Sequence, residues 1–298
     1  MSEDIRPILA TIPVLAGYTG PIDRLGGLTN RVYRLGDQVL RLPGAGTEDY
    51  INRHHEAASA TAAATAGVSP AVIFVDPASG IMVTQHIDGA NTMSPAGFRD
   101  RPGAITRAGQ SLRQLHDSGV TFPFRFELFA MIDNYLALLA TKDVALPAGY
   151  HDVVAAAGSI RTALLHNPVP LVACHCDPLC ENFLDTGAKM WIVDWEYAGM
   201  NDPMWDLGDL SVEGQFDADQ DAALLAAYFG GPAPAADRGR MVIYKAMCDL
   251  LWTLWGLIQL ANGNTADDFR AYADGRFARC RALMDTAGFS RAMAAITG

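Results

Sequence analysis

One short stretch of the chain concentrates side chains that can do polar chemistry. It runs Cys-His-Cys-Asp-Pro-Leu-Cys-Glu-Asn-Phe over positions 174–183 and places Asp177 and Asn182 in the order H-x-D-x4-N. A carboxylate such as Asp177 can accept or orient the proton of a hydroxyl group, and an amide oxygen such as that of Asn182 can help to hold a divalent cation. A second carboxylate, Asp194, follows after the next apparent hairpin. We therefore predict a site in which Asp177 orients an acceptor and two oxygen ligands, from Asn182 and Asp194, hold a metal ion.

Protein kinases use the H-x-D-x4-N spacing in the catalytic loop for phosphoryl transfer. That chemistry requires an aligned hydroxyl and neutralised phosphate charge, and these residues would supply both. A D-x4-N match often arises by chance, and the alternative is that Asp177 caps a turn and Asp194 ends a strand. The context favours phosphoryl transfer, because a hydrophobic strand precedes the loop and a hairpin that ends at Asp194 follows it.

Regular elements must position these residues, and the N-terminal part is predicted to be rich in strands. A Gly-Asp turn inside an alternating pattern predicts a hairpin, and an alanine-rich segment without proline predicts a helix that ends at Gly67. The predicted order is three strands, a helix and two strands: short β segments within 22–42 that include 31–35 and 39–42, a helix at 48–66, and strands at 71–75 and 81–86.

After Asp88-Gly89 the pattern becomes mainly helical. Predicted helices lie at 105–116, 128–141 and 151–165 and through the region after about 217, and short strands flank the reactive loop at 169–174, 182–185 and 190–194. The expected fold is therefore α+β and two-lobed. A small β-rich N-terminal lobe with its connector would span 1–88, and a larger, mainly helical C-terminal lobe would span 89–298.

The N-terminal part also offers residues suited to binding the phosphates of a nucleotide. Gly26-Gly27-Leu28-Thr29-Asn30 lies between strands, where backbone N–H groups could approach phosphates. Arg41 ends the third apparent strand, where protein kinases carry a phosphate-binding lysine, and Glu56 lies in the next helix at a place suited to pairing with it. Taken singly, these are typical of a plain turn, a solvated strand residue and a charge on a helix surface. Their order along the chain favours a nucleotide site.

Beyond the catalytic loop, the sequence resembles the choline/ethanolamine kinase family, within the larger group that includes the aminoglycoside phosphotransferases. The similar segments, which together span about 26–277, are Gly26–Tyr33, Val39–Gly44, Asp194–Gly199 with Asn201-Asp-Pro, Asp206-Leu-Gly and Glu213 after it, Leu251–Gln259, and Phe269–Phe277. The chain departs from the family pattern at Cys176, which is often Asn, at Pro178 and at Arg41, which is usually Lys. Arg keeps the positive charge but presents a different fork of donors.

The resemblance implies a protein-kinase-like fold, ATP and Mg2+ as cofactors, and a role for each matching residue. Asp177 would be the catalytic carboxylate and contact the acceptor, Asn182 and Asp194 would hold magnesium, and Arg41 and Glu56 would position the phosphates. The adenine would be lined by Gln85, His86 and Ile87, mostly through backbone groups. The amine pocket would be formed by Tyr197, Glu213, Trp252, Trp255 and Tyr272.

The aromatic residues of this pocket suit a quaternary ammonium, which cannot donate a hydrogen bond and is recognised by aromatic faces and nearby carboxylates. Trp252 and Trp255 are three positions apart on a predicted helix and so share a face. On their spacing alone, core packing explains these tryptophans better than an amine pocket does. The family resemblance makes the amine pocket the favoured interpretation. We predict an ATP-dependent kinase that converts choline to phosphocholine and ATP to ADP. The alternatives are ethanolamine, thiamine or an aminoglycoside as acceptor, or a catalytically silent protein that binds an amine or a nucleotide.

The composition limits the partners. The chain has 298 residues, of which 50% are hydrophobic, and a net charge of −11, so it can bury a sizeable core and should repel nucleic acid and anionic membranes. The N-terminus does not have the pattern of a secretory signal. The apolar stretch Met247–Ala261 contains Asp249 and is predicted to be a buried helix. We expect a cytoplasmic protein whose partner is a small amine alcohol, with no nucleic acid and no membrane insertion.

The cysteine pattern has two interpretations. Cys174, Cys176 and Cys180 cluster beside His175, as in some zinc sites. No second cluster of ligands follows at a usual spacing, and five cysteines is an odd number, which argues against a fully paired disulfide framework. Small buried side chains around a strand and loop are the preferred interpretation.

Overall fold

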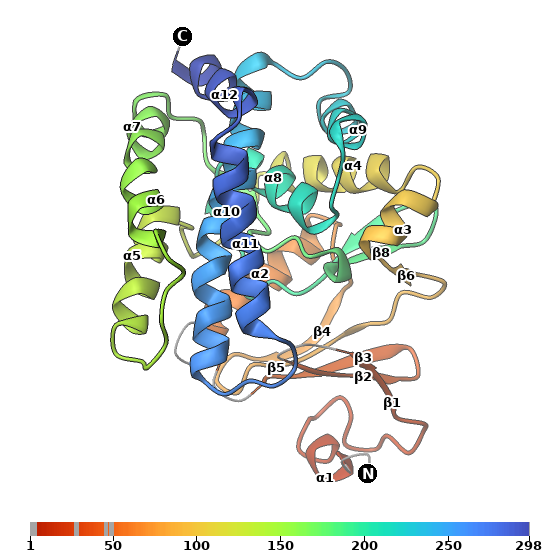
Figure 1. The fold of residues 1–298 in the computed structure, drawn as a ribbon. Helices are drawn as coiled ribbons and strands as arrows, with labels where there is room; N and C mark the ends of the chain where they lie inside the picture. The colour runs from red at the N-terminus through yellow and green to blue at the C-terminus, as the bar shows by residue number, and fades with distance from the viewer. Residues whose placement is uncertain (1–4, 27–29, 45–46, 48–50, 298) are drawn as a thin grey trace.

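An antiparallel sheet forms the N-terminal part of the protein. The computed structural model describes residues 5–26, 30–44, 47 and 51–297 (Figure 1). Its five-stranded sheet has the order β1-β2-β3-β5-β4. The strands are β1 (Asp23–Gly26), β2 (Arg31–Leu35), β3 (Gln38–Leu42), β4 (Val72–Asp76) and β5 (Ile81–Gln85), preceded by the short helix α1 (Arg6–Leu9). The predicted strands are confirmed to within a residue.

The turn between β2 and β3 fixes the register that places Arg41. Gly36 has a φ of +67°, a conformation that glycine adopts without steric cost. Leu35 pairs with Gln38, and Val32 pairs with Arg41. The strands alternate between buried and half-buried side chains, with Tyr33, Leu35, Leu40 and Leu42 in the core of the sheet. Because the side-chain period is two, this register fixes which face of β3 carries Arg41.

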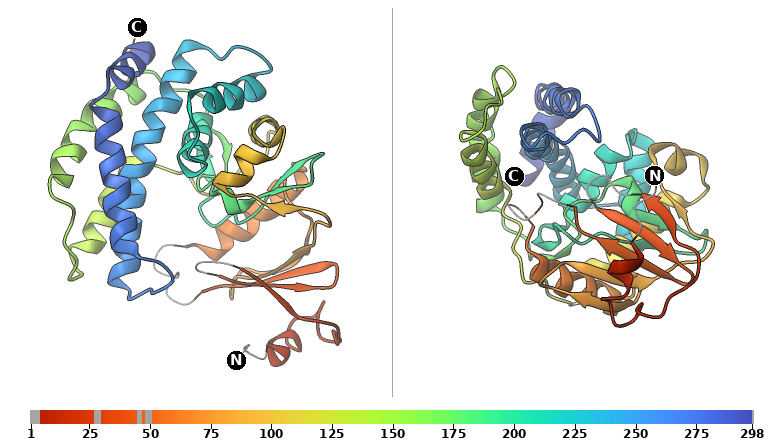
Figure 2. Two further views of the ribbon diagram at one scale, coloured as in Figure 1. Left: turned by 45° about the vertical axis from the view of Figure 1, so that its right-hand side comes forward. Right: turned by 90° about the horizontal axis from the view of Figure 1, so that it is seen from below.

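Helix α2 (Arg53–Thr65) crosses between the sheet and the helical part (Figure 2). The helix predicted over 48–66 starts later than expected, because Asn52 is extended and its side chain accepts from the backbone N–H groups of His54 and His55. Residues 48–50 of that prediction lie outside the described residues. The buried face of α2 consists of small side chains, including Ala57, Ala60 and Ala63, beside Glu56.

Ten of the described helices follow the five-stranded sheet along the chain. The ones not yet named are α3 (Pro95–Asp100), α4 (Ala104–His116), α5 (Leu128–Leu139), α6 (Tyr150–Ala156), α7 (Gly158–His166), α8 (Pro203–Glu213), α9 (Ala218–Phe229), α10 (Ala235–Ala261), α11 (Phe269–Met284) and α12 (Ala287–Thr297). The single helix predicted at 151–165 is wrong in detail, since it divides into α6 and α7 around Ala157. Helix α8 was not predicted.

Short strands surround the reactive loop. They are β6 (Asn91–Thr92), β7 (Val172–Cys174), β8 (Phe183–Asp185), β9 (Met190–Ile192) and β10 (Gly199–Asn201), with a 3-10 turn at Cys180–Asn182. Strand β7 pairs with β10, and β8 lies between β6 and β9. Three predicted bounds are corrected. The strand at 169–174 is shorter, Asn182 belongs to the 3-10 turn rather than to a strand, and Asp194 lies beyond the end of β9.

Two hydrophobic cores hold the molecule. A small core lies under the sheet and includes Ile5, Leu9, Leu40 and Val83, while a much larger one joins α2 to the helical part. Helix α10 is the centre of the larger core and packs against α5, α8, α11 and α12 (Figures 1 and 2). By length and composition α10 could cross a membrane, but 83% of its apolar window is buried inside the protein, as in a core helix. The buried helix predicted over Met247–Ala261 is the C-terminal part of α10.

Candidate active site

The catalytic loop is fastened to α8 by one buried carboxylate. Asp206 accepts the backbone N–H groups of His175 at 2.7 Å and of Cys176 at 2.8 Å. It also accepts from the ring Nε2 of His116, on α4, at 3.0 Å. The neighbouring Trp205 donates its Nε1–H to the carbonyl of Cys176 at 3.1 Å. A carboxylate that accepts several buried N–H groups is strongly constrained, so the loop has one conformation.

His175 joins the loop to the strand exit that carries Asp194. Its ring is fully buried, and Nε2 donates to the carbonyl of Val193 at 2.9 Å. Its Nδ1 accepts the backbone N–H of Asp177 at 3.3 Å, which fixes the tautomer. Burial lowers the pKa of His175, so the ring is neutral and bridges the backbone of Val193 and that of Asp177. The ring also packs on Trp195, with centroids 4.8 Å apart.

One cavity brings the three predicted reactive residues together. Asp177, Asn182 and Asp194 all line a cavity of about 330 Å³. The Asn182 amide donates its Nδ2–H to the carbonyl of Asp177 at 3.0 Å, which leaves its oxygen as the potential ligand atom. Burial, followed by the charges of Asp194 and Glu213, raises the pKa of Asp177 well above its usual range. The oxygen donors of Asn182 and Asp194 are of the kind that suits magnesium.

Two residues of this site have an unusual backbone conformation. Cys176 has a φ of +66° and Asp194 a φ of +71°. In the described ranges, Gln215 is the only other non-glycine residue with a positive φ. Such conformations are costly for residues with a Cβ and tend to occur where function fixes the backbone. The chain thus turns sharply at the residue before Asp177 and at Asp194 itself.

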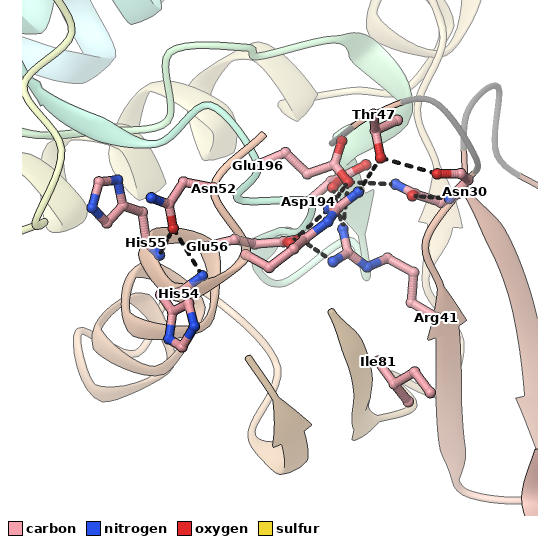
Figure 3. A network of polar contacts seen from close by, with 12 residues as sticks. Asn30, Arg41, Thr47, Asn52, His54, His55, Glu56, Ile81, Asp194 and Glu196 are labelled. Carbon is pink, nitrogen blue, oxygen red and sulfur yellow. Dashed lines mark hydrogen bonds and ion pairs between the residues drawn. The ribbon is translucent and has the colours of Figure 1, made fainter. Parts of the chain in front are cut away.

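A network of charges links the sheet to the cavity (Figure 3). Arg41 Nη1 lies 2.9 Å from Asp194 Oδ1 and 3.1 Å from Glu196 Oε1, and its Nη2 pairs with Glu56 on α2. Arg53 Nη1 lies 2.8 Å from Glu56 Oε2 and 2.6 Å from Glu196 Oε1. The structure therefore contains the pair suggested by sequence between Arg41 and Glu56. Arg53 was missed, although it stands three positions before Glu56 on the same helix.

The charges in this network shift the protonation of its members. Burial opposes ionisation of Glu196, but Arg41 and Arg53 outweigh it and lower the pKa of Glu196. Burial and the charge of Glu196 raise the pKa of Asp194 to about 7. The Asp194 side chain is 34% exposed, because it faces the cavity. Its oxygens are therefore reachable from the cavity, and solvent moderates the shift.

The predicted nucleotide loop is described only at its ends. Gly26 ends β1 and is exposed, and Gly27, Leu28 and Thr29 lie outside the described residues. Asn30 is buried, donates its Nδ2–H to Glu196 Oε1 at 3.0 Å and accepts the N–H of Gly44 at 3.3 Å. The far end of the loop is thus attached to the charge network.

The predicted adenine-binding residues lie at the end of β5. The backbone N–H of Gln85 donates to Ala71 at 2.9 Å, and that of His86 donates to Asp37 at 2.8 Å. These two donors are already engaged within the protein, and the carbonyl of Ile87 accepts the N–H of Ala90 at 3.4 Å.

Aromatic side chains line the other side of the cavity. Tyr197, Trp252, Trp255 and Tyr272 are all on its surface. The rings of Tyr197 and Trp252 are 5.2 Å apart, and those of Trp255 and Tyr272 are 5.7 Å apart, both edge to face.

Glu213 is placed differently from these aromatic residues. It is not among the described residues that line the cavity, and it pairs with Arg276 of α11. Arg276 lines the cavity in its place, with its guanidinium 4.6 Å from the centre of the Tyr272 ring. Sequence reasoning missed Arg276, although it lies one helical turn after Tyr272.

The cysteines form no shared ligand set. Cys174, Cys176 and Cys180 are buried free thiols, and burial raises the pKa of each. In the part of the chain that the structure describes, Cys174 approaches His116 and Asp206, but Cys176 and Cys180 belong to no such group. The packing interpretation of this cluster fits better than the zinc interpretation.

Comparison with known proteins agrees with this geometry. Residues 23–242 match the phosphotransferase enzyme family. A crystal structure of a choline/ethanolamine kinase family protein from Mesorhizobium loti is 68% identical, with a TM-score of 0.92 over 99% of this chain and 98% of that one. The chain belongs to the choline/ethanolamine kinase family. It is therefore a phosphotransferase that acts on an alcohol, as the sequence predicted.

More distant members of the choline/ethanolamine kinase family are also similar. The crystal structure of choline kinase LicA from Streptococcus pneumoniae is 26% identical, with a TM-score of 0.80 over 94% of this chain and 97% of that one. Protein LicA of Haemophilus influenzae is 26% identical over 259 residues, which cover 84% of this chain and 76% of the relative.

The fold is also shared by aminoglycoside 2'-phosphotransferase-IIIa, at 14% identity and a TM-score of 0.67. The predicted two-lobed, protein-kinase-like architecture is confirmed.

Proposed function

We propose that this phosphotransferase is an ATP-dependent choline kinase, which transfers the terminal phosphate of ATP to the hydroxyl of choline. The observation that carries the proposal is the composition of one cavity. Asp177 and the oxygen ligands Asn182 and Asp194 lie on its wall together with an aromatic set. A hydroxyl that binds beside Asp177 would thus belong to a molecule whose other end meets aromatic faces. Relatives named LicA, one of them described as a choline kinase, support the same acceptor.

Asp177 would act on the acceptor hydroxyl. A carboxyl whose pKa is raised by burial is a better proton acceptor than an ordinary aspartate, and it can take the hydroxyl proton as the bond to phosphorus forms. The loop contacts to Asp206 and His175 hold this carboxylate in place, so little reorganisation is needed.

The phosphate side of the site would use the charge network. Asn182 and Asp194 would hold magnesium, which neutralises charge on the phosphates when bound. Arg41 would contact the phosphates, and Glu56 and Glu196 would position its guanidinium fork. Gly26, Gly27, Leu28, Thr29 and Asn30 would bind the phosphates of the nucleotide, and Gln85, His86 and Ile87 would line the adenine.

The aromatic wall would bind the trimethylammonium group. Each contact between a cation and a ring contributes about 0.5–2 kcal/mol, with the larger values in desolvated sites. Glu213, which does not line the cavity, would offset the charge of its partner Arg276, which does. Ethanolamine carries three N–H donors and would require acceptors more than aromatic faces, so choline is favoured.

A cytoplasmic location and the division into lobes at 88/89 remain predictions.

The test is coupled ADP release with magnesium and ATP across choline, ethanolamine, thiamine and kanamycin, with the Asp177→Ala variant as control. Choline-dependent turnover that disappears in the variant supports the proposal. Turnover with another acceptor alone would keep the kinase chemistry and overturn the choice of choline. Choline binding in calorimetry without ADP release would identify a silent binder.

A further inference from the structure

Asp209 is a buried carboxylate that the mechanism above does not use. It lies on α8, is fully buried, and its Oδ2 accepts the indole Nε1–H of Trp252 at 3.1 Å. Its other oxygen, Oδ1, is also buried and has no hydrogen-bond partner among the described residues. A buried carboxylate with one unsatisfied oxygen is costly and requires an explanation.

Two arginines of α11 form ion pairs with carboxylates other than Asp209. Arg276 pairs with Glu213 and lies 3.2 Å from Asp249, and Arg279 lies 2.6 Å from Asp249. Within the described ranges, Asp209 has no ion pair. Glu213 thus has a direct ion pair, whereas Asp209 is influenced by the charge of Arg276 without forming one with it.

Asp209 is connected to the cavity through Trp252. The Trp252 ring lines the cavity and meets Tyr197 edge to face. An indole N–H that donates to a carboxylate gains electron density in its ring, and the face of such a ring attracts a cation more strongly. In a buried site the negative charge itself also acts over several ångströms, because the effective dielectric constant is low.

We propose that Asp209 is a positioning and specificity residue for the cationic head group, which it favours by orienting and polarising the Trp252 indole. The inference rests on the proposed function, since it assumes that Trp252 faces the head group of the acceptor. The head group would supply the positive charge that the protein leaves unmatched at Asp209. An uncharged acceptor of the same shape would gain nothing from this carboxylate.

Burial, followed by the charge of Glu213, raises the pKa of Asp209. A cation in the aromatic wall would favour the ionised form of Asp209, which is the same coupling viewed from the carboxylate. The Asp177 charge acts on Asp209 in the same direction as Glu213, so the two ends of the cavity share one electrostatic environment.

The experiment compares Asp209→Asn with the unaltered full-length protein. Asparagine keeps the size of the side chain and an acceptor for the indole but removes the charge. Choline and 3,3-dimethylbutan-1-ol, its uncharged isostere, serve as acceptors in coupled ADP release, and tetramethylammonium serves as a cation without a hydroxyl in calorimetry. We expect kcat/KM for choline and affinity for tetramethylammonium to fall about 10-fold, with less than about a 2-fold change for the isostere and for the KM of ATP. Asp274→Asn, which removes an exposed carboxylate of α11, is the matched control.

Several outcomes would overturn the inference. Equal losses for choline and the isostere would mean that Asp209 only supports the fold of the wall, and unchanged affinity for tetramethylammonium would mean that its charge is not felt. If Asp209→Asn does not fold, Trp252→Phe keeps a ring and removes the N–H, and it should lower the preference for choline over the isostere. Failure of the unaltered protein to use choline, combined with tetramethylammonium binding that depends on Asp209, would reject the choline kinase proposal alone.

Discussion

Arg41 Nη1 and Asp194 Oδ1 are 2.9 Å apart, although 153 positions separate the two residues in sequence. The pair joins the third strand of the N-terminal sheet to the residue that follows the β8–β9 hairpin of the helical part (Figure 3). One residue is the proposed phosphate contact and the other a proposed metal ligand. Their contact means that the two halves of the proposed phosphate site meet directly, where the sheet faces the helical part.

This relationship predicts a double effect of changing Arg41. Arg41→Met would leave Glu56, which is 2% exposed, paired with Arg53 and without its second cation, and a buried carboxylate that loses a cation destabilises the fold. We expect the free energy of unfolding to fall by about 3 kcal/mol in urea denaturation. Arg41→Lys should restore most of this stability but raise the KM for ATP, because lysine lacks the fork. Arg34→Met, on the exposed side of β2, should change neither quantity; equal effects at both positions would contradict the role given to Arg41.

The fastening of the catalytic loop to α8 predicts a strong dependence on Asp206. Asp206→Ala would orphan three buried donors, the N–H groups of His175 and Cys176 and a ring nitrogen of His116. The expected loss is about 3–5 kcal/mol in the free energy of unfolding, measured by urea denaturation. Replacement of Asp274, which pairs with Arg270 on the exposed side of α11, by alanine should cost less than about 1 kcal/mol. A mild effect at Asp206 would show that the loop is held by other contacts.

The aromatic wall predicts a selective loss of acceptor binding. Trp255→Leu should raise the KM for choline about 10-fold, because a cation–ring contact disappears, while the KM for ATP stays unchanged. Trp191→Leu is the matched control, since this half-buried tryptophan of β9 lies under Lys189 rather than in the cavity. Steady-state kinetics with each substrate varied separately provides the measurement, and parallel changes in both KM values would count against the assignment.

The raised pKa of Asp194 predicts a pH-dependent stability. With a pKa of about 7, the folded protein keeps the Asp194 proton between about pH 4 and pH 7, where the unfolded chain has lost it. This group therefore lowers the free energy of unfolding as the pH rises through that interval. Asp194→Asn removes the effect. The difference in the free energy of unfolding between the variant and the unaltered protein should therefore favour the variant by about 1 kcal/mol more at pH 8 than at pH 5, after allowance for solvent screening.

Thermal and urea unfolding at the two pH values, without nucleotide or metal, measure this difference. Asp133→Asn, which removes an exposed carboxylate of α5, should show no dependence on pH. A gain at pH 5 as large as that at pH 8 would mean that Asp194 is already ionised in the folded protein at pH 5.

Much of the architecture was accessible from the sequence, because local signals agreed with the tertiary contacts. The Gly-Asp turn and alternating pattern at 31–42 predicted the hairpin, and the H-x-D-x4-N spacing placed Asp177, Asn182 and Asp194 in one site. Helix α8 was missed because it is buried on nearly all sides, so its side chains lack the amphipathic period that marks a surface helix. The start of α2 was misplaced because the sequence just before Asn52 contains no proline or glycine to mark a boundary, whereas the Asn52 cap depends on the extended backbone and side-chain hydrogen bonds of that residue.

The parts of the site that were missed depend on contacts between distant elements. Each missed residue has a partner on a distant element. Arg53 pairs with Glu196, just before β10, Asp209 accepts from Trp252 on α10, and Arg276 pairs with Glu213 on α8. Glu213 was expected in the amine pocket from the resemblance, and only the three-dimensional packing reveals that its partner Arg276 lines the cavity instead. Pairings of this kind are set by packing and not by sequence spacing.

The five buried thiols allow the opening of the folded protein to be measured by chemical labelling. Each cysteine is free and buried, and burial raises the pKa of every one, so a thiol-reactive reagent meets neither an exposed sulfur nor a thiolate in the folded state. Alkylation must therefore wait for local or global unfolding. Because three of the thiols lie along the catalytic loop and two lie on α10 and α11, the labelling rate at each would report separately how often the loop and the helical core open.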